Sequence, residues 1–87
     1  MVDGQRYETE WQGMRLVAEA RPHHWQVFVY HIEHCEVLHT AQRVNLDVAK
    51  CAAVEFAAAY CFGPRNGLEP GIIAEMLVWE PVGLNPS

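Results

Sequence analysis

The stretch from Asn45 to Phe62 constrains the fold more than any other because its pattern is that of a helix. Its sequence, NLDVAKCAAVEFAAAYCF, is rich in alanine, the residue with the highest helix propensity. Asn45 is a suitable N-cap, and Asp47 places a negative charge at the positive end of the helix dipole. Gly63 and Pro64 follow directly and end the pattern. The sequence therefore predicts a helix over Asn45–Phe62.

The two sides of this helix are both largely apolar. At about 100° per residue, one face carries Leu46, Ala49, Ala53, Phe56, Ala57 and Tyr60. We expect this face to pack on a sheet. The far side carries Val48, Cys51, Val54, Ala58 and Phe62. A helix with so little polar surface is usually covered on more than one side, so we expect the C-terminal segment or a second subunit to cover it.

Three further segments predict an antiparallel meander ahead of the helix: Met14–Ala20, Trp25–Glu33 and Glu36–Arg43. Their connections are too short for a parallel crossover. Trp25–Glu33 is dense in aromatic and β-branched residues and is apolar on both faces, which is typical of a strand covered twice.

The ends of the chain are harder to assign. Residues 1–12 are predicted as a loosely ordered lead-in, with a short edge strand over Tyr7–Trp11 as the alternative. Ile72–Glu80, before Pro81, is predicted as a fourth strand, with a short helix as the alternative, and residues 81–87 as an irregular tail. The predicted fold is a single α+β domain, a two-layer sandwich in the order strand–strand–strand–helix–strand.

Composition narrows the classes of protein. The chain has 87 residues, 51% of them hydrophobic and 20% charged, which suits one small globular domain. No apolar run approaches the roughly 20 residues that span a bilayer, and the polar, acidic N-terminus does not resemble a signal peptide. The three cysteines form no paired spacing, which favours reduced thiols. A cytoplasmic protein is the expectation.

The apolar surface on the helix and the central strand exceeds what a small monomer readily hides. We therefore expect a homodimer, with cover by the chain itself as the alternative. The expected function is protein interaction or self-association without catalysis and without a cofactor. The candidate interface residues are Val48, Cys51, Val54, Ala58, Phe62 and Trp79.

The first alternative is nucleic-acid binding through a local basic patch around Arg15, Arg21 and Arg43. The formal net charge of −5 opposes it, because long-range electrostatics would repel a phosphate backbone.

The second alternative is a metal-binding hairpin within His31–His39. This stretch holds His31, His34, Cys35 and His39, which are all metal-ligand types, and His31 and His39 could approach as a cross-strand pair. The spacings fit no standard structural zinc pattern, so we expect no metal site. We also expect no enzyme, because the only serine is Ser87 and GPRNG at residues 63–67 lacks the lysine and hydroxyl of a phosphate-binding loop.

Overall fold

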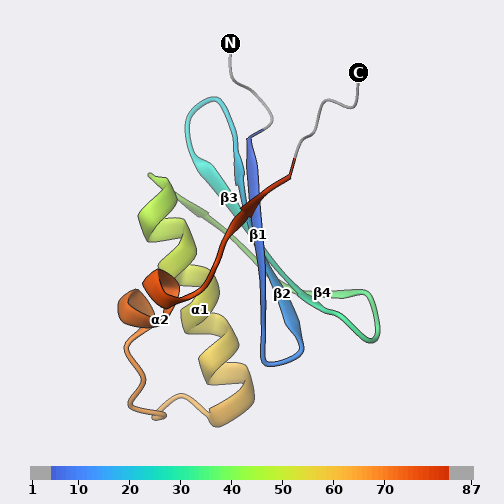
Figure 1. The fold of residues 1–87 in the computed structure, drawn as a ribbon, viewed down its shortest axis with the longest axis vertical. Helices are drawn as coiled ribbons and strands as arrows, with labels where there is room; N and C mark the ends of the chain where they lie inside the picture. The colour runs from blue at the N-terminus through green and yellow to red at the C-terminus, as the bar shows by residue number, and fades with distance from the viewer. Residues whose placement is uncertain (1–4, 83–87) are drawn as a thin grey trace.

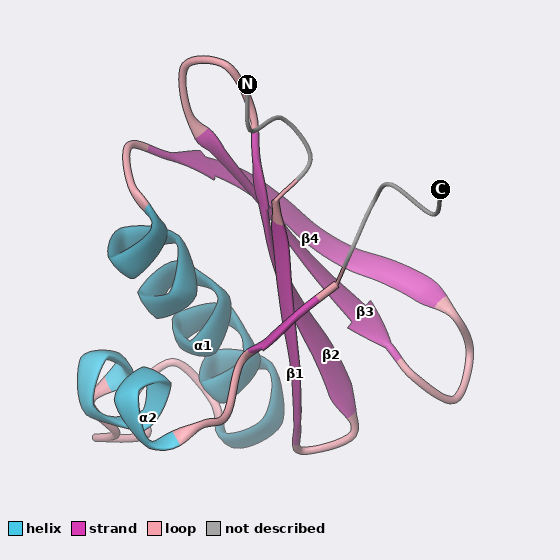
Figure 2. Ribbon diagram, turned by 45° about the horizontal axis from the view of Figure 1, so that its top comes forward, coloured by secondary structure: helices cyan, strands magenta, loops and turns pink. Residues whose placement is uncertain are grey.

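The computed structural model describes residues 5–82, which form an antiparallel sheet with helices on one side (Figures 1 and 2). This part of the chain contains five strands and two helices: β1 Arg6–Trp11, β2 Met14–Ala20, β3 Trp25–His31, β4 Glu36–Arg43, α1 Leu46–Phe62, α2 Pro70–Met76 and β5 Glu80–Pro81. The predicted α+β class is confirmed. None of the described helices is long and apolar enough to cross a membrane.

Four strands precede α1, where the sequence predicted three. The sheet order is β4-β3-β2-β1-β5, and all neighbours are antiparallel. Residues 1–12 were predicted as a loosely ordered lead-in, with a short edge strand over Tyr7–Trp11 as the alternative. Residues 6–11 form a strand that pairs with β2 along its whole length. Gln12 and Gly13 explain this, because both have positive φ, 55° and 77°. That is the backbone of a two-residue type I′ turn, whose twist matches that of a hairpin.

The prediction of a fourth strand over Ile72–Glu80 is wrong for most of that segment. Pro70–Met76 forms α2, so the alternative of a short helix is the one that forms, and only Glu80–Pro81 is a strand, at the outer edge of β1. Proline suits the first turn of a helix, where its missing N–H is not needed. Ile73, Ala74 and Leu77 then pack toward the core at helical spacing. The predicted irregular tail lies outside the described residues from position 83 onward.

The helix α1 lies across β2, β3 and β4 on one face of the sheet (Figure 2). Ala49, Ala53 and Ala57 are fully buried there, as the sequence predicted, whereas Tyr60 is exposed. The sheet contributes the buried side chains of Met14, Leu16, Ala18, Val27 and Val29 to the same core. Because alanine is small, the axis of α1 can approach the sheet closely.

The ends of α1 follow the sequence signals closely. Asn45 Oδ1 accepts a hydrogen bond from the Val48 amide at 2.9 Å, which satisfies a donor of the first turn. Gly63 has a φ of 92°, and its N–H donates to the Ala59 carbonyl at 2.9 Å. A left-handed residue at this position commonly ends a helix.

The opposite face of the sheet, called here the open face, carries Val17, Phe28 and Tyr30. No element among residues 5–82 covers it (Figure 2). Val17 is nevertheless fully buried. The prediction that β3 is covered on both faces therefore does not hold within the described chain.

Candidate functional site

The far side of α1, where the sequence placed an interface, is covered at its centre by α2. Val54 and Ala58 are buried, and Ala74 of α2 is buried with them. The Cys51 sulfur would lie 3.5 Å from a Cβ built on Gly71, so the two helices approach closely there. The chain itself thus supplies the cover that was expected either from the C-terminal segment or from a second subunit.

The other predicted interface residues lie apart from one another. Val48 and Phe62, near opposite ends of α1, are 41% and 51% exposed. Phe62 contacts the edge of the Trp11 ring, with centroids 6.2 Å apart. Trp79 is half-buried, its Nε1–H donates to the Ala74 carbonyl at 3.0 Å, and Lys50 Nζ lies 5.5 Å from its ring centroid. Trp79 therefore ties the segment after α2 to the helices.

The outward side of α2 carries the more exposed apolar surface. Ile72 and Met76, called here the α2 ridge, are 54% and 75% exposed. They are four residues apart and so lie on the same side of the helix. Sequence analysis missed them because it treated this segment as a strand. The four-residue spacing of half-buried Ile73 and Leu77, next to exposed Ile72 and Met76, is the helical signal that could have found them.

A shallow hollow lies between α1 and α2. It measures about 230 Å³ and is lined by Asp47, Lys50, Cys51, Gly71, Ala74 and Glu75. The small side chains of the lining leave room for an inserted side chain. Val48 on α1 and Ile72 on α2 are exposed apolar residues of the two helices that line the hollow. This hollow and the α2 ridge together form the candidate interaction surface.

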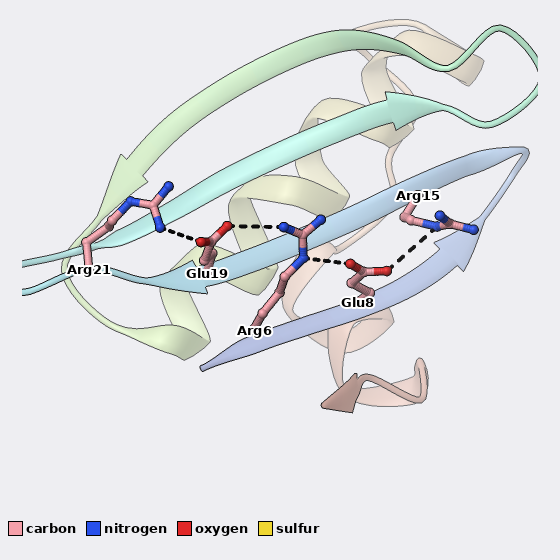
Figure 3. A network of polar contacts seen from close by, with 5 residues as sticks. All are labelled: Arg6, Glu8, Arg15, Glu19 and Arg21. Carbon is pink, nitrogen blue, oxygen red and sulfur yellow. Dashed lines mark hydrogen bonds and ion pairs between the residues drawn. The ribbon is translucent and has the colours of Figure 1, made fainter. Parts of the chain in front are cut away.

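The open face carries a row of ion pairs across β1 and β2 (Figure 3). Arg6 contacts Glu8 at 2.6 Å through Nε and Glu19 at 3.2 Å through Nη1. Arg21 contacts the same Glu19 at 2.6 Å. Arg6 and Glu19 are directly opposite in the register, an arrangement in which opposite charges stabilise a strand pair.

Arg15 extends this row toward the β1–β2 turn. It contacts Glu10 at 2.9 Å through Nη2 and Glu8 at 3.8 Å through Nε. The hydrogen bond with Glu10 raises the pKa of Arg15. Burial lowers the pKa of Arg6, but its hydrogen bond to Glu8 and the charges of Glu8 and Glu19 outweigh burial, so the pKa is raised. Both guanidinium groups stay charged at any physiological pH.

The predicted basic patch does not assemble as one surface. Arg15 and Arg21 lie on the open face, but each contacts a glutamate. Arg43 is opposite Trp25 in the register, so it lies on the helix-covered face instead. Glutamates that neutralise the arginines remove the electrostatic footprint that nucleic-acid binding requires.

The histidines of the β3–β4 hairpin are divided between two places. His31 and His39 do not form the cross-strand pair that the sequence allowed, because the turn places His31 opposite Glu36 and a bulge between Val29 and Tyr30 places His39 opposite Val29. The His39 ring stacks on Phe56, with centroids 4.4 Å apart. His31 lies 4.5 Å from His34, and its Nδ1 is buried without a hydrogen-bond partner among residues 5–82. No group of three or more metal-ligand side chains forms within residues 5–82.

Comparison of the chain with protein-family models, with curated proteins and with solved structures found no match. The function must therefore be argued from the surfaces of this chain alone.

Proposed function

We propose that this protein is a non-catalytic self-association module whose helical layer packs against the helical layer of a second copy. The observation that carries the proposal is the exposure of Ile72 and Met76 on the outward side of α2. Two large apolar side chains on one side of a short helix are an unusual feature to leave in water, and such patches commonly mark interfaces.

The shape of the surface is consistent with this proposal. The hollow lies between α1 and α2, and its lining includes the small residues Cys51, Gly71 and Ala74. In a twofold dimer the same patch meets itself, so the ridge of each copy contacts the hollow of the other. Asp47, Lys50 and Glu75 lie around the hollow, which gives the apolar contact a charged rim.

Sedimentation equilibrium over a range of protein concentrations tests the proposal. We expect a species of twice the 9.9 kDa monomer mass, with a dissociation constant on the order of micromolar. Ile72→Ser and Met76→Ser should each weaken the dimer about tenfold or more, because each removes a large apolar side chain from a buried contact.

Val37→Ser is the matched control. Val37 is 49% exposed and lies on β4, away from the helical layer, so its replacement should leave the dimer unchanged. A protein that stays at 9.9 kDa at all concentrations would overturn the proposal. A dimer that dissociates with Val37→Ser but not with the α2 variants would place the interface on the sheet instead.

A further inference from the structure

The open face holds a second feature that is independent of the helical layer. A hollow of about 380 Å³ lies beside β3 and the start of the β3–β4 hairpin. Its lining is Arg6, Arg15, Tyr30, His31, Ile32 and Cys35. Two arginines therefore line this hollow, while no carboxylate does. The volume lies in the range of sites that bind small ligands.

The charged residues of the ion-pair row line two different hollows. Glu8, Glu10 and Glu80 line a separate hollow of about 360 Å³ with Arg15, next to β5. The ion pairs of Arg6 use Nε and Nη1, and those of Arg15 use Nε and Nη2. Nη2 of Arg6 and Nη1 of Arg15 take part in no ion pair among residues 5–82. Each guanidinium thus has one terminal nitrogen outside the ion pairs, and Arg6 also has the Tyr30 side chain as a neutral hydrogen-bond partner, which raises its pKa.

The glutamates also hold the two arginines in place. Glu8 contacts both arginines, and Glu19 contacts Arg6 (Figure 3). Glu10 contacts Arg15 at 2.9 Å. A long side chain that is already ordered loses less conformational entropy when it binds a ligand. Guanidinium groups form strong, directional hydrogen bonds with carboxylates and phosphates.

We propose that this hollow binds a small organic anion, whose carboxylate or phosphate group contacts Arg6 and Arg15 and whose apolar part lies against Tyr30 and Ile32. The tyrosine hydroxyl adds a neutral donor, and the ring and Ile32 supply apolar surface. The proposal does not rest on self-association, because the hollow lies on the opposite side of the sheet from the helices.

Charge alone does not bring an anion to this place. Arg6 and Arg15 lie among Glu8, Glu10 and Glu19, and the whole chain has a net charge of −5. Directional hydrogen bonds at short range must therefore supply the affinity. We expect planar carboxylates and phosphate esters to bind and chloride to compete poorly, so the affinity should depend only weakly on salt.

An NMR titration of the ¹⁵N-labelled full chain tests the site. The probes are benzoate, phenyl phosphate and inorganic phosphate, with benzamide as the uncharged match of benzoate. We expect benzoate and phenyl phosphate to shift amides of residues 30–35 with dissociation constants on the order of millimolar, and benzamide to bind about tenfold more weakly or not at all. If inorganic phosphate binds as well as phenyl phosphate, the hollow recognises the anionic group alone. If phenyl phosphate binds more tightly, the hollow recognises the whole organic anion.

Two variants and a matched control locate the binding. Arg6→Gln and Arg15→Gln should each weaken benzoate binding about tenfold, since each removes a charged hydrogen-bond donor. Arg21→Gln removes an arginine of the same ion-pair row that does not line the hollow, so benzoate should bind as it does to the original chain. Tyr30→Phe should weaken benzoate binding less than either arginine variant, because it removes a neutral hydroxyl and leaves the charge of the site unchanged.

The proposal is overturned if benzoate and phenyl phosphate give no shifts at concentrations on the order of 10 mM. It is also overturned if benzamide matches benzoate or if Arg21→Gln weakens binding as much as Arg15→Gln does. The dimer variants Ile72→Ser and Met76→Ser serve as a separate check, because anion binding should persist in them. Failure of self-association and failure of anion binding are therefore distinguishable.

Discussion

Ala53 shows how a single small side chain sets the distance between the helix and the sheet. It is fully buried in α1, beside the core residues of β2 and β3. Protein interiors are packed densely, so a larger side chain here must displace either the helix or the sheet.

We predict that Ala53→Leu lowers the free energy of unfolding by about 1–3 kcal/mol through overpacking. Urea unfolding followed by circular dichroism measures the change. Glu55→Leu is the control, because it introduces the same side chain at an exposed position of α1 and should alter stability by no more than about 0.5 kcal/mol. Equal losses in both variants would show that helix propensity, and not packing, sets the cost.

Among the elements, α1 depends on its first turn as well as on its packed face. The Asn45 side chain accepts the Val48 amide at 2.9 Å, and Asp47 follows in the first turn. No basic residue lies in the last turn to stabilise the other end. The N-terminal cap is therefore the main local determinant of where the helix begins.

We predict that Asn45→Ala lowers the free energy of unfolding by about 1 kcal/mol, because the side chain that caps the Val48 amide is lost. Asn45→Asp should retain most of the stability, since a carboxylate accepts the same hydrogen bond and suits the helix dipole. Thermal unfolding of the three proteins under one buffer tests this. A stable alanine variant would mean that water satisfies the amide equally well.

At the scale of the whole molecule, the two proposed surfaces lie on opposite sides. The α2 ridge and its hollow belong to the helical layer, and the two arginines belong to the open face. A dimer formed through the helices therefore leaves both anion sites exposed. The net charge of −5 on each copy opposes the association of two copies.

We predict that added salt strengthens self-association, because it screens the repulsion between two acidic chains. The dimer dissociation constant should fall several-fold between about 0.01 M and 0.15 M sodium chloride. Glu75→Gln, which removes one charge beside the hollow, should strengthen the dimer at low salt and reduce its salt dependence. Weaker association at high salt would instead indicate attractive charge pairs across the interface.

Local patterns were sufficient for some parts of this structure. The bounds of α1 follow from Asn45, the alanines and Gly63, all of which act on their nearest neighbours in the chain. The alternation of β2 places Leu16 and Ala18 on one face for the same reason, and the structure buries both. In contrast, β1 depends on pairing with β2, and short-range composition carries little sign of that pairing.

The candidate surfaces depended on contacts between distant parts of the chain. The sequence by itself determined the long helix, its buried alanine face and the faces of the central strand, because propensity and side-chain period are local properties. Only the tertiary structure decided that α2 covers the far side of α1 and leaves Ile72 and Met76 outside. It also decided that Arg6 and Arg15 line one hollow without a carboxylate, while Glu8 and Glu10 line another together with Arg15. Such arrangements arise from strand register and from packing between segments far apart in sequence, which no local pattern specifies.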